Sequence, residues 1–325
     1  YVVADAPDSN AATQEADRLI TQEKVEAIIG TQSSSLSYAA SAVAERKKVF
    51  YWEVEGISDS ITNRGFKYIF RPTFCAEYMA KQMMGFVNDV VAIKMGKDIK
   101  ELRIALVQED GGFGTSTANN LRKYAKEYGI SFVEDLTYSA KSAEVNSLVI
   151  KLKSKNPDVL LAVSYINDAI LLTKTSLELG FEPKVTIGTT AGHGTPDFVN
   201  ALGEKAEGIF AAGIPNAVNP DKMKQKQKEL YNELVRRYKE KRGKEPSVNV
   251  FNGFNGAYIL LTEVLPNAKE VKADAIKKAA LEVSLNEGDT ILGYGVKFAG
   301  PDESNAGQNI RSFAAVMQWQ GGKLY

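Results

Sequence analysis

The sequence predicts an α/β protein built as two lobes, each a doubly wound parallel sheet with helices on both faces. Short apolar, β-rich runs alternate with helical patterns along the chain, and such strand–helix–strand units form right-handed crossovers between parallel strands. The chain has 325 residues, of which 44% are hydrophobic. That length is too great for one ordinary core and suits two.

The elements follow in order, with strands assigned to apolar runs and helices to the segments between them. A highly charged stretch fits an exposed helix supported by i,i+4 pairs, and the C-terminal run reads as two strands around a Gly-Gly hairpin. The expected strands are 1–6, 25–30, 49–54, 67–74, 102–110, 130–138, 158–165, 184–190, 206–215 and the hairpin of 312–325. The expected helices are 10–23, 34–47, 76–95, 116–128, 142–154, 167–179, 221–244 and 248–265.

Composition excludes several classes of function. The chain holds 40 basic and 40 acidic residues, and a nucleic-acid binder normally carries a basic excess. It has one cysteine, Cys75, and one histidine, His193. An intrachain disulfide, a CxxC site and a zinc or haem site are therefore not expected, and we predict no cofactor. No apolar run is long enough to span a bilayer.

In open α/β sheets, ligands bind at the carboxyl ends of the strands, so the segments that follow the strands are the candidates for a site. "GTQSSS" lacks the lysine of a phosphate-binding loop, and the glycines of "DGGFG" and "GTTAGHGT" do not have dinucleotide-binding spacing. A serine hydrolase would pair a serine with His193, but no nucleophile elbow is present. The segments concerned are 30–35, 53–57, 110–114, 164–168 and 188–194.

Three serines, Ser33 to Ser35, stand where a strand ends and a helix begins. A helix N-terminus presents free N–H groups and a partial positive charge, and serine hydroxyls add further donors. This arrangement suits a small carboxylate. The alternative is that Ser34 or Ser35 only caps the helix.

Several motifs together resemble the type I periplasmic binding proteins of the leucine/isoleucine/valine-binding class, the solute receptors of ABC importers. They include "RLI", "IIGTQSSS", the "RG-x-x-x-x-R" pattern ending at Arg71, "VQEDGGFG", "KNPDVLLAVSY", "ELGF", "GEKAEGIFAAG" and "AVMQWQGGK", in the family's order over essentially the whole chain. The resemblance implies two lobes joined by three crossovers, a ligand in the cleft between them and closure by a hinge. The expected lobes are 1–72 with 216–292, and 73–215 with 293–325.

The resemblance also implies a set of ligand contacts. Ser34 would meet the ligand carboxylate, Tyr165 and Phe113 match aromatic contacts of the second lobe, and Phe251 matches a wall of the side-chain pocket. The full set of expected ligand-binding residues is Gln32, Ser33, Ser34, Ser35, Glu55, Gly56, Ile57, Phe113, Tyr165, Thr190 and Phe251.

Two of these positions depart from the family pattern for amino-acid binders. Thr190 stands where the family has a glutamate that grips the ligand ammonium, and Ile57 stands where it has a threonine. Glu53, Glu55 and Asp168 are the candidates for the missing partner. Otherwise the solute lacks an α-amino group, and we predict weaker binding of leucine or valine than of a non-amino carboxylate or amide.

The family begins with a strand, a glycine-rich loop and a helix, whereas this chain opens at what resembles the second strand. Because the first strand lies inside such a sheet, we expect a preceding strand and helix, or another segment in that slot. The resemblance implies a non-enzymatic monomer that is periplasmic or membrane-anchored outside the cell and that delivers its solute to a membrane permease. A ligand-sensing domain of a signalling receptor is the first alternative, and a serine hydrolase the second.

Overall fold

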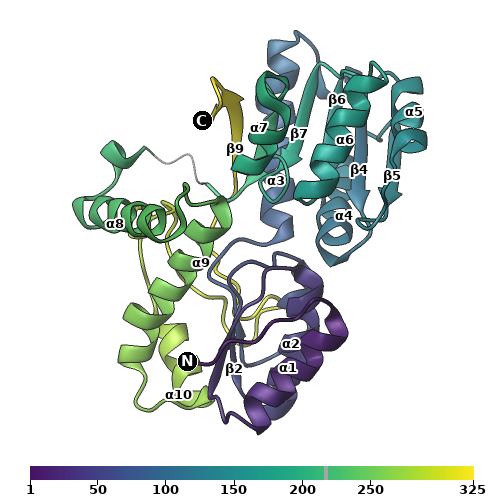
Figure 1. The fold of residues 1–325 in the computed structure, drawn as a ribbon. Helices are drawn as coiled ribbons and strands as arrows, with labels where there is room; N and C mark the ends of the chain where they lie inside the picture. Colours follow the sequence, from purple (N-terminus) through teal and green to yellow (C-terminus); the bar gives the residue numbers. More distant parts are fainter. Residues whose placement is uncertain (216–218) are drawn as a thin grey trace. The chain divides into compact units, whose positions relative to one another are not determined.

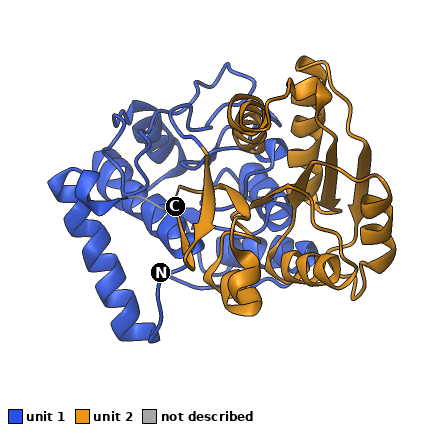
Figure 2. Cartoon of the chain, turned by 90° about the horizontal axis from the view of Figure 1, so that it is seen from above, with its two compact units in different colours: residues 1–75, 218–313 blue, residues 76–217, 314–325 orange. Residues whose placement is uncertain are grey.

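The computed structural model describes residues 1–215 and 219–325 (Figure 1). The chain folds into two compact units, the first from residues 1–75 and 219–313 and the second from 76–215 and 314–325 (Figure 2). The chain thus passes between units three times, as the resemblance implied. The first passage follows Cys75, and the expected boundary at 216 falls outside the described residues. In the described part of the chain, no helix combines the length and the apolar character needed to cross a bilayer.

Unit 1 is built on a parallel sheet in the order β1-β2-β3. One face carries a core in which Phe50, Trp52 and Phe298 pack with α9 and α10. The opposite face packs Tyr51 and Ile28 against α1 and α2. The elements of this unit are α1 (Ser9–Thr21), β1 (Ala27–Ile29), α2 (Ser34–Lys47), β2 (Phe50–Trp52), β3 (Ile69–Phe70), α8 (Gln225–Arg242), α9 (Val248–Ile259) and α10 (Ala273–Glu282).

Unit 2 holds a seven-stranded sheet in the order β10-β9-β8-β7-β6-β4-β5, in which β9 is antiparallel to both of its neighbours, β8 and β10. If the parallel strands β4, β5, β6, β7 and β8 are numbered 1 to 5 along the chain, their order across the sheet is 2-1-3-4-5. The direction in which successive strands are added therefore reverses between β4 and β6. Its elements are α3 (Ala76–Phe86), β4 (Ile104–Glu109), α4 (Gly112–Glu127), β5 (Glu134–Tyr138), α5 (Asn146–Ser154), β6 (Val159–Val163), α6 (Ile166–Glu178), β7 (Val185–Thr189), α7 (Pro196–Leu202), β8 (Phe210–Gly213), β9 (Ala315–Gln320) and β10 (Lys323–Leu324).

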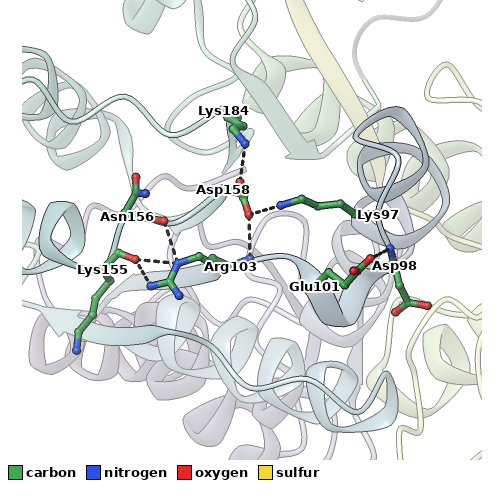
Figure 3. A network of polar contacts seen from close by, with 8 residues as sticks. All are labelled: Lys97, Asp98, Glu101, Arg103, Lys155, Asn156, Asp158 and Lys184. Atoms are coloured by element: carbon green, nitrogen blue, oxygen red, sulfur yellow. Dashed lines mark hydrogen bonds and ion pairs between the residues drawn. The ribbon is translucent and has the colours of Figure 1, made fainter.

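An ionic network fixes the amino ends of β4 and β6 in unit 2 (Figure 3). The Asp158 carboxylate accepts hydrogen bonds from the Lys97 and Lys184 ammonium groups at 3.3 and 2.9 Å and from the Arg103 N–H at 3.2 Å. Partial burial alone would raise its pKa, but these hydrogen bonds lower the pKa of Asp158 to about 2. The network joins the residues that stand directly before β4, β6 and β7.

The predicted strand at residues 1–6 is wrong. This segment is without regular secondary structure, and β1 has a strand partner, β2, on one side. A cavity of about 510 Å³ lies between the segment and β1 and is lined largely by apolar side chains of both and of α1 and α2. Because strands must lie about 4.8 Å apart to pair, the segment has no ladder to join. The expected additional strand and helix stay a prediction.

The segment 293–313 folds with unit 1, whereas the sequence analysis assigns it to the second lobe. Leu285 pairs with Val296, and the Arg71 region of β3 bridges to Gln308. Val296 and Phe298 are buried in the aromatic core beside β2. The turn-rich sequence after Leu292 therefore corresponds to a segment without helices or strands that packs on unit 1. It is not a passage between the two units.

Candidate functional site

The serine cluster lies at the carboxyl end of β1 and the start of α2. Ser33 is the N-cap, because its hydroxyl accepts the N–H of Leu36 at 3.3 Å. The alternative prediction was that Ser34 or Ser35 caps the helix, but the N-cap of α2 is Ser33. Ser34 is 2% exposed, and its Oγ accepts the N–H of Ser58 at 3.1 Å. Ser34 thus joins α2 to the loop after β2 and keeps one hydroxyl hydrogen to donate.

The loop after β2 is held by Glu53. Its Oε1 accepts the N–H groups of Glu55 and Gly56 at 2.8 and 2.6 Å, and the side chain is fully buried. Burial raises the pKa of Glu53 to about 7, although hydrogen bonds to the carboxylate oppose the shift. Glu53 thus organises the loop through Oε1, while its Oε2 is buried without a hydrogen-bond partner among the described residues.

Arg71 fixes the same loop from the other side. Its buried guanidinium donates to the carbonyl oxygens of Gly56 and Ser58 at 3.1 and 2.7 Å and to Thr62 Oγ1 at 3.1 Å. Its Nε–H donates to Gln308 Oε1 at 2.6 Å. Arg71 ends the "RG-x-x-x-x-R" motif, but no role was predicted for it from the sequence. The sequence places this arginine directly after an apolar strand. A buried arginine is almost always paired, so a role in holding neighbouring chain could have been predicted from that position.

The packing at Gly56 leaves no room for a side chain. A Cβ there would lie 2.8 Å from Ser37 Oγ and 2.9 Å from Ile61 Cδ1. Ile57 is 7% exposed, and Gln32 is exposed at the surface beside the serines. Unit 1 therefore brings the expected residues of its first two strand ends together around one rigid loop.

Helix α9 adds a polar group that the sequence analysis missed. Asn252 is 1% exposed and donates from Nδ2 to the Val54 carbonyl at 2.6 Å. It also donates a hydrogen bond that lowers the pKa of Glu55 against the larger, raising effect of burial. Phe251 beside it stacks on Tyr231 with ring centroids 5.1 Å apart. The signal was present in "VNVFNGFNG", where asparagines recur every third residue in an apolar helix.

In unit 2 the structure brings Phe113 and Tyr165 together at the point where the strand order reverses. Their ring centroids are 5.1 Å apart, Phe113 after β4 and Tyr165 after β6. The acidic side chains beside them accept hydrogen bonds from groups of the same unit. Glu109 accepts the N–H groups of Gly111 and Gly114, and Asp168 accepts the N–H of Tyr165 and the hydroxyl of Tyr138.

Thr190 has a structural contact within unit 2. Its Oγ1 accepts the N–H of Ile214 at 3.1 Å, and the side chain is 4% exposed. A Cβ on Gly213 would lie 2.3 Å from that oxygen, so the threonine fills the space beside the end of β8. A direct role of Thr190 in ligand binding stays a prediction.

Ser164 and His193 form the only Ser–His contact recorded among the described residues. Ser164 Oγ lies 3.4 Å from His193 Nδ1, and the two residues are 0% and 1% exposed. Burial lowers the pKa of His193 to about 4. His193 packs against the Phe198 ring with centroids 4.9 Å apart. At 3.4 Å this contact is longer than the hydrogen bond that usually joins an activated serine to its base.

The comparison with known families identifies the chain. The model of a family described as "Periplasmic binding protein" matches residues 1–323. The chain belongs to this family. The binding protein is also similar to "Leu/Ile/Val-binding protein homolog 7" of Brucella suis, with 36% identity over 99% of the chain and 79% of the relative. Homolog 8 of Brucella abortus is 35% identical over 98% of the chain and 77% of the relative.

Solved structures agree on the fold. The binding protein matches a leucine-binding protein, LivK, of Thermotoga maritima with a TM-score of 0.81 and 20% identity, over 98% of this chain and 83% of that one. It matches a solute-binding protein of an ABC transporter from Rhodopseudomonas palustris, in complex with 3,4-dihydroxybenzoic acid, with a TM-score of 0.79 and 18% identity, over 100% and 83%. The type I fold of the Leu/Ile/Val-binding class is thus confirmed. The family is one of extracytoplasmic solute-binding receptors.

Proposed function

We propose that this binding protein is the receptor of an ABC importer and that it binds a small carboxylate-bearing solute, either a branched-chain or hydrophobic amino acid or a related organic acid. The observation that carries the proposal is the start of α2. There a buried serine hydroxyl, Ser34, stands beside the first N–H groups of a 14-residue helix, at the carboxyl end of β1. Helix N-termini bind carboxylates through these N–H groups and the helix dipole.

The rigidity of the surrounding loop supports this assignment. Ser58 N–H, Glu53 and Arg71 fix the loop at hydrogen-bonding distance from α2, so the donors need no large rearrangement when an anion arrives. The proposal extends to Phe113 and Tyr165 of unit 2 and to Phe251 of unit 1, which would contact the apolar part of the solute. The names of the relatives, which refer to leucine, isoleucine and valine, support this range of solutes.

Isothermal calorimetry on the purified chain tests the proposal. The panel consists of leucine, isoleucine, valine and phenylalanine, their deaminated carboxylates, and the corresponding alcohols without a carboxylate. We expect at least one carboxylate to bind and its alcohol to bind at least tenfold more weakly, because the alcohol leaves the donors of α2 unpaired. Equal affinity for acids and alcohols, or no binding of any acid, would contradict the proposal.

A further inference from the structure

Unit 2 contains a cavity that the candidate site does not use. Its volume is about 220 Å³, and its walls come from α6, the first half of β7 and residues 205–209 before β8. A cavity of about 150 Å³ with apolar walls is already large enough to hold benzene. None of the expected ligand-binding residues is among the described residues that line this cavity. An occupant would therefore bind apart from the solute of the proposed function.

The cavity combines apolar walls with a few uncharged polar groups. Leu160, Leu172 and Phe181 belong to a buried core cluster of unit 2 and also line the cavity. Ser176 of α6 and Thr186 of β7 contribute hydroxyl groups. Small-molecule sites in proteins have this composition, with predominantly apolar walls and a small number of polar groups that orient the ligand.

The charged residues that line the cavity balance one another. They are two acids and two bases, Glu182, Lys184, Lys205 and Glu207. Lys184 Nζ pairs with Asp158 at 2.9 Å, and the Glu207 carboxylate accepts two backbone N–H groups of the turn between β9 and β10, each at 2.8 Å. An ion would lose its hydration in the cavity without meeting an excess of opposite charge, so an uncharged ligand fits better.

His193 also lines this cavity, and its imidazole ring is held in one place. The ring packs against Phe198 with centroids 4.9 Å apart, and it covers Gly188, where a Cβ would clash with the ring. The Trp319 Nε1–H donates to the His193 carbonyl at 2.6 Å. His193 is 1% exposed, so the ring cannot turn towards solvent without displacing these neighbours.

The two ring nitrogens of His193 differ in their contacts. Nδ1 lies 3.4 Å from Ser164 Oγ, whereas Nε2 has no hydrogen-bond partner among the described residues. Nε2 is also not one of the sealed, unpaired polar atoms in that part of the chain, so it stays reachable from the cavity. Burial lowers the pKa of His193 to about 4, which keeps the ring neutral near pH 7. Nε2 then accepts or donates one hydrogen bond, depending on the tautomer, and a hydroxyl group can pair with it in either case.

We infer that this cavity is a second binding site, for a small uncharged molecule with an apolar body and one hydroxyl group, such as a phenol or a compact alcohol. The hydroxyl group pairs with His193 Nε2, and the apolar body lies against the side of the cavity formed by the core cluster of unit 2. Buried polar atoms are paired in the great majority of cases, and the occupant supplies the partner that Nε2 lacks. The inference goes beyond the proposed function, because it uses no residue of the start of α2.

Nuclear magnetic resonance of the imidazole nitrogens tests the inference directly. The chain has one histidine, so its nitrogen resonances can be observed without overlap. The probes are phenol and toluene, which differ by a hydroxyl against a methyl group. Phenol should shift the Nε2 resonance in a saturable manner and more than the Nδ1 resonance. It should bind roughly tenfold more tightly than toluene, because toluene leaves Nε2 unpaired. An imidazole that phenol leaves unshifted, or equal affinity for the two probes, would overturn the inference.

Variants of two lining residues locate the probe. Ser176→Leu places a larger side chain in the cavity and should weaken phenol binding roughly tenfold or more. Ser147→Leu, at an exposed position of α5, is the matched control and should keep the wild-type affinity. His193→Phe retains an aromatic ring beside Phe198 but has no nitrogen, so calorimetry should find its affinities for phenol and toluene within about threefold of each other. A phenol preference that persists in His193→Phe would contradict the role of Nε2.

Calorimetry of the best carboxylate, with and without saturating phenol, separates this site from the solute site. The affinity for the carboxylate should stay the same, because the two sites share no residue. Competition between phenol and the carboxylate, with no shift of the imidazole resonances, would place phenol in the solute site and overturn the inference. Failure of every carboxylate to bind would contradict the proposed function and leave the phenol site standing.

Discussion

At the scale of single residues, neighbouring serines have different tasks. Ser33 caps α2 through its contact with Leu36, while Ser34 bridges to Ser58 and stands at the first turn. An N-cap can be recognised by its β-region backbone and its bond to the third residue along, and only Ser33 meets both conditions. Substitutions of Ser33 and Ser34 should therefore have different effects on stability and on ligand affinity.

Ser34→Ala should weaken binding of the best carboxylate found by calorimetry by about 1.5–3 kcal/mol, typical of a hydrogen bond to a charged group. It should also cost about 1 kcal/mol of stability, because the buried N–H of Ser58 loses its acceptor. Ser33→Ala should cost about 1 kcal/mol of stability through the lost cap. If Ser34→Ala lowers stability and leaves affinity unchanged, Ser34 is only a bridge within the fold.

Glu53 predicts a pH dependence of stability. Its pKa is about 7 in the folded protein against 4.5 as the ordinary value. The folded state therefore holds this proton more firmly than the unfolded state, so the contribution of Glu53 is fully present below pH 4.5 and is lost as the pH rises to about 7. The loss is on the order of 3 kcal/mol.

Urea unfolding of wild type and Glu53→Gln at several pH values between 4 and 8 measures this effect. The amide keeps an acceptor for the N–H groups of Glu55 and Gly56 but does not titrate. The difference in unfolding free energy between the two proteins should change across that window in favour of the variant at higher pH. A constant difference from pH 4 to 8 would show that Glu53 is not held protonated by burial.

At the scale of elements, the loop after β2 depends on chain that is remote in sequence. Arg71 joins the carbonyl oxygens of Gly56 and Ser58 to Gln308, and Gln308 in turn donates to the Thr73 carbonyl at 2.8 Å. Asn309 donates to the carbonyls of Pro72 and Gly295. The segment 293–313 thus helps to hold the loop after β2 in place through Arg71. None of its residues is among the expected ligand contacts.

Arg71→Lys should destabilise unit 1 by about 3–5 kcal/mol, because an ammonium cannot reproduce the fork of bonds and leaves several buried acceptors unpaired. Thermal unfolding followed by circular dichroism measures the change. Arg122→Lys in unit 2 is a suitable control, since that half-exposed guanidinium pairs with Asp135 at the surface and should cost no more than about 1 kcal/mol. Equal losses for the two variants would show that Arg71 contributes as a charge and not through its geometry.

At the scale of the whole molecule, family membership leads us to expect that a solute makes the protein more compact and more stable. A ligand present at a hundred times its Kd stabilises the folded state by about 2.7 kcal/mol through mass action alone. Small-angle scattering with and without a saturating carboxylate should show a smaller radius of gyration in its presence. An unchanged radius with a solute that binds tightly and raises the melting temperature would rule out hinge closure.

The sequence by itself determined the fold class, the elements that surround the site and the position of the serine cluster. These follow from local pattern, since apolar runs, helix starts and glycine turns act within a few residues of one another. The helix at 34–47 coincides with α2, and the Gly-Gly hairpin joins β9 and β10. The resemblance to the Leu/Ile/Val-binding class, carried by such local motifs, was confirmed by the family match.

Only the tertiary structure decided how the polar groups are paired. Glu53, Glu55, Asp168 and Thr190 could not be ranked from the sequence, because their availability depends on which N–H group or side chain lies beside each oxygen. The same holds for segment 293–313, whose place in unit 1 depends on burial against an aromatic core formed over two hundred residues earlier in the chain. Hydrogen-bond partners are chosen across space and not along the chain, and for that reason the unpaired, shielded oxygens of Glu53 and Glu55 became visible only in the folded protein.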